Sequence, residues 1–447
     1  MLRGRTAMVV VRGVAAMCLL VTGAALAAES VRTLDVVPEA SPSVVFAASA
    51  SRPPERLSLT LAEAERLWTQ HNRELRLAEV AIAGAEGDAR AAAQIPNPQA
   101  SLNMASISPQ DGFGAGSVRQ KRMDSVARLE QLIERGGKRD LRMQAADALL
   151  NAARNDRDDV GRQQRRALYA AYYDLLLMQE RERLTVETAA LYRKSQATSE
   201  VRYRGGDISA ADLSRQRVEQ LRAENDARQA VADAARARVA LAYLIGQEKK
   251  ASSLVAADDW PAATQGSDAA AGSDPSRRPD VRADMARLAA AEKARDLARA
   301  LKTRDITVGV QLEHNLTNTP NNSFGVGVSA PLFAFHEYEG EIARAEADLQ
   351  AAREMAAQTL AQAQGEIDQA AADLAASRER RLRLEGGLLD DAARVARAAE
   401  FAYARGATSL LELLDARRTW RQVQLEAANA RADHAKALAA WRAATAE

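Results

Sequence analysis

The chain has 447 residues and a formal net charge of +1, and 4% of its residues are aromatic while 27% are charged. A nearly neutral chain has no bulk field that attracts nucleic acid, so the composition argues against a nucleic-acid partner. Ala, Arg, Glu and Leu dominate the sequence, which is typical of long helices packed through small side chains rather than of several ordinary domains.

Residues 1–27 have the pattern of a secretory signal peptide. A basic start precedes an apolar run that ends in the small-residue cleavage site Ala25-Leu26-Ala27. The single cysteine, Cys18, follows Met17, whereas a lipoprotein signal needs a small residue there. We therefore expect cleavage near Ala27, no lipid on Cys18, and a linker over residues 28–56.

A first set of elements follows this linker. Thr60 and Glu63 form a capping-box pattern that predicts a helix from about Ala62 to Gln94. Apolar and polar residues then alternate, which predicts a strand over residues 100–105 and a return strand within residues 118–133. Two long helices come next, from about Arg139 to Arg204 and onward to about Ile245.

The same plan recurs after a polar linker over residues 253–277. The second copy is predicted to contain a helix from Arg278 to about Leu301, strands over residues 306–313 and 323–330, a helix from about Tyr338 to Arg405, and a last helix to about Ala444. We therefore interpret residues 57–252 and 278–447 as two structural repeats.

Each long helical hairpin turns at a Tyr-x-x-Gly-x-x-Ser sequence. Glycine permits the positive φ of a helix end, and the serine, or Thr408 in the second copy, can cap the next helix. The two copies are Tyr203, Gly206 and Ser209 in the first half and Tyr403, Gly406 and Ser409 in the second.

Each half also contributes one pair of strands with an apolar face and a polar or Gly-lined face. This pattern is typical of a barrel wall between lipid and water, although a half-buried sheet on a helix gives the same alternation. Two strand pairs cannot close a barrel, and an open sheet edge cannot lie in lipid. Several copies must therefore pool their strands: three would supply twelve and two would supply eight.

Several segments together match a known family. They are Leu59-Thr60-Leu61-Ala62-Glu63-Ala64, Ile95-Pro96-Asn97-Pro98, Gly136-Gly137-Lys138-Arg139, Arg278-Pro279-Asp280-Val281, Val328-Ser329-Ala330-Pro331-Leu332-Phe333 and the two tips. With these segments in this order, the chain resembles the TolC family of outer-membrane efflux channels, and most closely its heavy-metal branch. Leu132 departs from the pattern, because the first half usually repeats the proline seen at Pro331.

The resemblance implies a mainly α fold with β-structure, internally duplicated. A trimeric outer-membrane β-barrel with four strands per chain would continue into a long α-helical barrel. Such a protein has no cofactor and no enzymatic activity. The expected surroundings are a Gram-negative outer membrane with its lipid and a long periplasmic extension. The expected partners are two more copies, a periplasmic membrane-fusion adaptor and an inner-membrane resistance–nodulation–division pump.

The expected function is a passive exit duct of a tripartite efflux system, with heavy-metal cations as cargo. A drug-efflux channel and a type I secretion channel of the same fold are alternatives. A periplasmic adaptor protein is an alternative from another class, although an adaptor would have one helical hairpin and no duplicated strand pairs.

Glu412 and Asp415 are the candidate constriction residues. Spaced i and i+3, they share one face of the helix just beyond the second tip, and the resemblance places acidic constriction residues at these positions. The residues alone would favour an ordinary solvated helix face. Asp212, the counterpart of Glu412 in the first half, is a weaker candidate.

The resemblance implies further roles at the tips. The candidate gate contacts are Tyr203, Tyr403, Arg405 and Thr408, and the candidate adaptor-docking residues are Gly205, Gly206, Ser209, Gly406 and Ser409. We expect no metal-binding site, because the histidines lack ligand spacing; they are His71, His314, His336 and His434.

Overall fold

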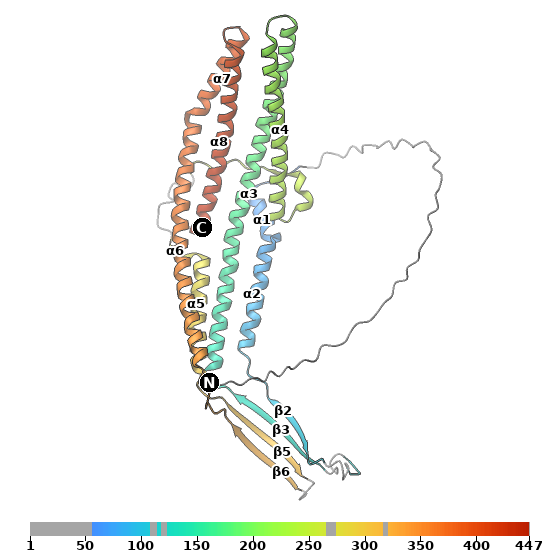
Figure 1. Ribbon diagram of the computed structural model, residues 1–447, viewed down its shortest axis with the longest axis vertical. Coiled ribbons are helices and arrows are strands. Elements are labelled where there is room, and N and C mark those ends of the chain that lie inside the picture. The colour runs from blue at the N-terminus through green and yellow to red at the C-terminus, as the bar shows by residue number, and fades with distance from the viewer. Residues whose placement is uncertain (1–55, 108–113, 118–122, 265–273, 316–320, 447) are drawn as a thin grey trace, which may run out of the picture. The chain divides into compact units, whose positions relative to one another are not determined.

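Long helices and small sheets make up the computed structural model of the chain (Figure 1). The structure describes residues 56–107, 114–117, 123–264, 274–315 and 321–446. These residues belong to one unit, residues 53–447. The predicted signal peptide and most of the predicted linker over residues 28–56 lie outside the described residues.

The same order of elements occurs twice in the described residues. The first half holds β1 (Leu57–Leu59), α1 (Leu61–His71), α2 (Arg73–Ala92), β2 (Gln99–Ala105), β3 (Asp124–Ile133), α3 (Lys138–Arg204) and α4 (Ala210–Leu244). The second holds β4 (Leu254–Ala256), α5 (Pro279–Ala300), β5 (Ile306–Asn315), β6 (Asn321–Ser329), α6 (Glu339–Arg383), a π-helical segment (Leu384–Leu388), α7 (Leu389–Ala404) and α8 (Leu410–Thr445). Among the described helices, none combines the length and apolar character needed to cross a membrane.

The single helix predicted from Ala62 to Gln94 is wrong, because α1 and α2 are separated at Asn72. The Asn72 amide N–H donates to the Trp68 carbonyl at 2.8 Å and closes α1. Its side-chain Oδ1 accepts from the Leu75 amide at 3.0 Å and begins α2. Asn72 thus satisfies free backbone groups of two helix ends at once. The capping box predicted at the start of α1 is confirmed.

Two short strands were not predicted. β1 and β4 pair in parallel, with Leu57 opposite Leu254, so the start of the predicted linker over residues 253–277 is part of a sheet. Both strands pack on the main apolar cluster, which includes Trp68 and Tyr172. Three-residue strands give too little alternation to be recognised in a sequence.

The other strands of the two halves join in one antiparallel sheet with the order β2-β3-β5-β6. β3 pairs with β5 across the halves, with Leu129 opposite Val310. β2 and β6 are the edges of this sheet, and three antiparallel steps make them run in opposite directions. Of the return strand predicted within residues 118–133, β3 occupies 124–133, and residues 118–122 lie outside the described residues.

Leu132 does not end β3, which continues through it to Ile133. A leucine retains the backbone N–H that a ladder needs, and Leu132 lies opposite Thr307 in the register. In the second half β6 ends at Ser329, shortly before Pro331, since proline lacks this donor.

One face of the four-stranded sheet is apolar and exposed. Leu312, Phe324 and Val328 expose 63%, 66% and 69% of their surface, and the register places Leu102 and Leu129 on the same face. Large apolar side chains exposed along a whole face need a cover that this single chain does not supply among its described residues.

The opposite face of the sheet is polar. Arg128 donates to the Gln311 Oε1 at 2.8 Å and forms an ion pair with Glu130 at 3.3 Å. Gly309 gives these long side chains room, because a Cβ there would lie 2.9 Å from the Glu130 Cγ. The alternation predicted from the sequence is thus confirmed.

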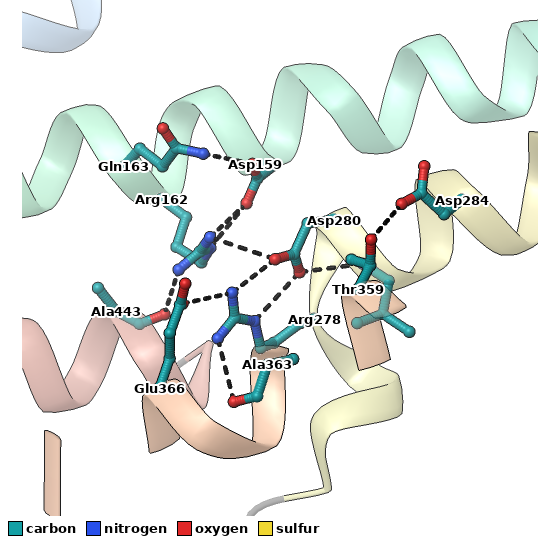
Figure 2. Close-up of polar contacts among 11 residues, drawn as sticks. Asp159, Arg162, Gln163, Arg278, Asp280, Asp284, Thr359, Ala363, Glu366 and Ala443 are labelled. Atoms are coloured by element: carbon teal, nitrogen blue, oxygen red, sulfur yellow. Dashed lines mark hydrogen bonds and ion pairs between the residues drawn. The ribbon is translucent and has the colours of Figure 1, made fainter. Parts of the chain in front are cut away.

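A buried arginine ties the start of α5 to the helices around it (Figure 2). Arg278 is 2% exposed, and its Nη2 donates to Asp280 at 2.5 Å and to Glu366 at 2.8 Å. Burial alone would raise the pKa of Asp280, but Arg278 and Arg162 hold this pKa below its ordinary value. Arg162 comes from α3 and lies 3.6 Å from Asp280, so the cluster joins the two halves.

The helix predicted from Tyr338 to the second tip is interrupted. α6 ends at Arg383, the π-helical segment Leu384–Leu388 follows, and α7 begins at Leu389. The described backbone leaves the helical region at Gly387, with φ 168° and ψ −40°. Glycine is a poor helix former, so the pair Gly386-Gly387 favours an interruption of the helix at this point.

The packing of the end of α4 against α1 can be tested at Gly246. Gly246 has a φ of +67°, and an added Cβ would lie 2.6 Å from the His71 Cβ. We expect Gly246→Ala to lower the thermal stability, because a left-handed alanine costs about 1–2 kcal/mol and His71 must also move. Gly206→Ala is the matched control, since Gly206 has a φ of +84° and open space around the added Cβ. Equal losses in thermal unfolding followed by circular dichroism would contradict the close contact of α4 with α1.

Candidate gate at the helical tips

Both long hairpins turn through the same backbone motif. After α3, the Gly206 amide donates to Tyr203 O at 3.0 Å and the Asp207 amide to Arg202 O at 2.9 Å. After α7, the Gly406 and Ala407 amides make the same two bonds, at 3.0 and 2.9 Å. This is the Schellman motif, which places a glycine at positive φ, and Gly206 and Gly406 have φ of +84° and +74°.

Serine begins the returning helix at both tips. Ser209 Oγ accepts from the Asp212 amide at 3.1 Å, and Ser409 Oγ accepts from the Glu412 amide at 3.3 Å. The two serines share the same φ and ψ of −77° and 158°. Ser409 is therefore the cap of α8, and Thr408 is not.

The first turns of α8 have two opposite faces. Leu410, Leu413 and Leu414 are buried in an apolar cluster with Tyr192 of α3 and Ala223 of α4, so α8 packs on the first hairpin. Glu412 and Asp415 lie on the exposed face of the same turns. The structure thus brings the two predicted constriction residues together on one exposed helical face.

These two acids begin a longer polar row along α8, which we call the acidic row. It consists of Glu412, Asp415, Thr419, Gln422, Glu426, Asn429 and Asp433, spaced alternately by three and four residues. The row contains only carboxylate, amide and hydroxyl groups over about 30 Å of helix. Arg380 pairs with Asp433 at 3.2 Å, but among the described residues no ion pair reaches Glu412, Asp415 or Glu426.

The corresponding row of α4 has alternating charges instead. Arg215 takes the place of Asp415 and lies 3.4 Å from Asp212, and Arg222 lies 3.1 Å from Glu219. Ser209 Oγ also donates to Asp212 at 2.8 Å. The first turns of the two rows share one geometry, but Asp212 has an ion-pair partner in the first, whereas no described ion pair reaches Glu412 or Asp415 in the second.

The predicted gate contacts differ in what they touch within one chain. Tyr403 lies under Arg202 of α3, with the guanidinium carbon 5.4 Å from the ring centre, and packs against the apolar cluster. Arg405 lies 3.8 Å over the ring of Phe401 on its own helix. Tyr203 is exposed and Thr408 is half-buried. Only Tyr403 among these four is seen to bridge the two hairpins in the described contacts.

An ion pair that the sequence did not predict joins the two hairpins. It lies one turn beyond Leu414 along α8. Arg418 of α8 donates to Glu219 of α4 at 2.5 and 3.1 Å. These bonds with Arg418, supported by Arg222, lower the pKa of Glu219 despite its burial. A sequence signal did exist: Glu219 precedes Ala223 and Ala227 by four and eight residues, so it shares a helix face with them. A carboxylate that is buried on such a face requires a partner.

The histidines are dispersed among the described elements. His71 contacts the Leu67 carbonyl, His336 contacts Glu341, and His434 is buried beside Arg381. Burial and then Arg381 lower the pKa of His434. Within the described ranges, no three His, Cys, Asp or Glu side chains are grouped so that they could hold a metal ion.

Comparison with known proteins shows which proteins this architecture resembles. Residues 275–447 match the family described as outer membrane efflux protein. The second half of the chain is therefore similar to an outer membrane efflux protein domain. This match begins just before Arg278 and includes β5, β6 and the acidic row. The resemblance inferred from the sequence is thereby confirmed.

A curated relative extends the likeness into both halves. The cobalt-zinc-cadmium resistance protein CzcC of Cupriavidus metallidurans is 27% identical over 293 residues, which are 64% of this chain. The matched region spans 65% of the length of that relative.

Solved structures share the fold over most of the chain. The CmeC outer membrane channel of Campylobacter jejuni gives a TM-score of 0.72 at 18% identity, covering 93% of this chain and 94% of that one. The outer membrane protein VceC of Vibrio cholerae gives 0.71 at 21% identity, covering 86% and 95%. At these identities the likeness shows the fold, which is mainly helical with a small sheet.

The contact between the hairpins predicts a measurable coupling. In a double-mutant cycle of Glu219→Gln and Arg418→Gln, we expect a coupling of about 1 kcal/mol at neutral pH, since a charged hydrogen bond contributes ~1.5–3 kcal/mol and Arg418 is partly exposed. Because the folded-state pKa of Glu219 is lowered, this stability is present above the unfolded pKa of about 4.3 and is lost as the pH falls through the folded pKa.

The control is the exposed pair Arg183–Glu187, at 3.2 Å on α3. Its cycle should give about 0.5 kcal/mol or less. Chemical or thermal unfolding of the four variants in each cycle measures both couplings. A coupling for Glu219 and Arg418 no larger than that of the control would show that the pair does not hold the hairpins together.

Proposed function

We propose that this chain is the outer-membrane channel of a tripartite efflux system and works as a homotrimer. In this proposal the four-stranded sheets of three copies form a β-barrel in the lipid of a Gram-negative outer membrane. The helical hairpins form a tunnel across the periplasm. The protein is a passive duct without enzymatic activity, fed by a resistance–nodulation–division pump through a membrane-fusion adaptor that docks at the tips.

One observation carries the proposal. The four-stranded sheet has two open edges, β2 and β6, that run in opposite directions, and one of its faces is apolar and exposed. Opposite directions allow β6 of one copy to pair with β2 of the next in the same antiparallel manner. A closed ring of such sheets satisfies every edge and turns the apolar faces outward, which is what lipid demands.

The proposed cargo is divalent metal cations. The name of the relative CzcC, a cobalt-zinc-cadmium resistance protein, supports this choice. Glu412 and Asp415 at the start of the acidic row support it independently, because exposed carboxylates that form no ion pair attract cations along a water-filled path. Three copies would bring six carboxylates of Glu412 and Asp415 to the neck.

The mass of the assembly tests this proposal. In mild detergent, multi-angle light scattering of the full mature protein should give three chains, because an isolated sheet with two open edges is unstable in an apolar medium. A monodisperse monomer that retains its helical content would contradict the barrel.

The carboxylates of Glu412 and Asp415 predict a preference of the channel for cations over anions. Replacing Glu412 and Asp415 together by Ala removes their charge and keeps helix propensity. The reversal potential in planar bilayers under a salt gradient should move towards zero. The trivalent-cation concentration for half-block should rise about tenfold or more, as expected when a charged contact of ~1.5 kcal/mol is lost.

The matched control uses the corresponding positions of the first tip. Asp212→Ala with Arg215→Ala removes one charge of each sign, and these two residues already pair at 3.4 Å. Selectivity and block should stay close to those of the parent protein. If instead the double variant of Glu412 and Asp415 keeps the parent's selectivity and block, these residues do not form the constriction. The recordings should be made at about 0.1 M salt, where the electrostatic screening length is ~10 Å.

A further inference from the structure

The π-helical segment Leu384–Leu388 interrupts only one of the two long outgoing helices. Its counterpart in the first half is the stretch from Leu184 to Thr188, and there α3 runs unbroken from Lys138 to Arg204. The first half has ordinary side chains at the positions where the second has Gly386 and Gly387. The same fold is therefore stable with a continuous helix, and the break is an addition in the second half.

Packing does not explain the two glycines. A Cβ added at Gly386 or Gly387 would meet no described atom within 4 Å. Each position could hold an alanine, which favours the helical state about fivefold over glycine. What glycine supplies without any steric need is backbone freedom, and a π-turn inside an α-helix is a frequent place for a functional bend.

The helix on the α6 side of this break is firmly held. Glu385 accepts from Arg381 Nε at 3.1 Å and from Arg431 Nε of α8 at 2.6 Å. Arg431 also lies 3.1 Å from Glu180 of α3, and Arg381 donates to the Pro261 carbonyl at 2.6 Å. Four segments are thus fastened to one another at the end of α6.

The helix beyond the break has few fully buried side chains. α7 buries Ala392 and Ala396, so little apolar area fixes its first turns. Its other contacts lie towards the tip, where Glu400 pairs with Arg417 of α8 at 2.9 Å and Tyr403 packs on the apolar cluster. A cavity of about 330 Å³ lies among α3, α7 and α8 and is lined by Leu184, Leu191 and Trp420, among others. Close packing usually prevents movement between helices, and here α7 has space beside it.

We propose that Gly386-Gly387, in the π-helical segment Leu384–Leu388, is the pivot on which the second tip moves, and that the ion-pair cluster around Glu385, directly before the two glycines, is its fixed base. When the tip that carries Glu412 and Asp415 shifts, α7 changes its angle to α6 at Gly386-Gly387, and α8 follows by gentle bending. This inference rests on the proposed channel function and names how its neck is regulated. The first tip has no such pivot in α3, so the two tips of each chain move unequally.

Hydrogen exchange on the assembled full-length protein tests the pivot without requiring conduction. The amides of residues 384–390 should exchange at least about tenfold faster than those of 184–190, because local opening is easier there. In the variant Gly386→Ala with Gly387→Ala, this difference should shrink by about fivefold or more. Equal exchange of the two stretches in the parent protein would overturn the proposal.

Single-channel recording tests the consequence. The double alanine variant should spend several-fold less time open than the parent, since the tip movement must now bend a continuous helix. The matched control is Gly365→Ala in α6, where an added Cβ also meets no described atom within 4 Å but the helix is regular. The control should gate like the parent. If the double variant gates like the parent although its amides have become protected, the segment is not the pivot.

The two proposals fail in different ways. A parent protein that conducts no current contradicts the channel, while the exchange comparison still decides whether the segment opens locally. A conducting parent with an unaltered double variant contradicts the pivot alone. The single variant Gly386→Ala repeats both measurements should the double variant not assemble.

Discussion

The hydrogen bonds of the two sheet edges are the constraint on which the proposed architecture depends. Each edge strand of β2-β3-β5-β6 presents N–H and C=O groups that one chain leaves unpaired within the sheet, and lipid offers no partner for them. Soluble proteins protect such edges with charges or covers, whereas here the exposed face beside the edges carries Leu312, Phe324 and Val328. In the proposed trimer, pairing of the edge strands between copies would satisfy the open hydrogen bonds and turn the apolar face towards lipid. It would also arrange the hairpins of neighbouring copies around one axis.

Because the chain is internally duplicated, its two helical tips can be compared with each other. The tips share a Schellman motif, a serine cap and the same cap dihedrals, so both turns have the same backbone conformation. They differ in charge, where Arg215 faces Asp212 in one copy and Asp415 accompanies Glu412 in the other, and in stiffness, where α3 is continuous and α6 is not. The shared tip backbone does not require these differences, and we propose that they serve gating and selectivity.

Features with a local signal could be predicted from the sequence. The glycine and serine of each tip, the alternating strands and the capping box at Thr60 were predicted because short-range backbone chemistry decides them. The misses have non-local or weak causes. Asn72 breaks a helix that propensity alone would continue, and β1 exists only because β4 lies beside it. The Glu219–Arg418 pair needed the α4–α8 packing to be known.

The chemistry of the acidic row also limits what this chain can select. Carboxylate and amide oxygens prefer hard cations over anions but distinguish poorly among divalent metals, whose separation relies on imidazole or thiolate ligands and a fixed geometry. The acidic row lies along one face of a helix, so it offers negative charge without a fixed coordination geometry. Tight coordination would also oppose a duct, because an ion that binds strongly leaves slowly. In the proposed function, discrimination between metals therefore belongs to the component that loads the channel, and this chain would keep a negative, water-filled path that opens at the second tip.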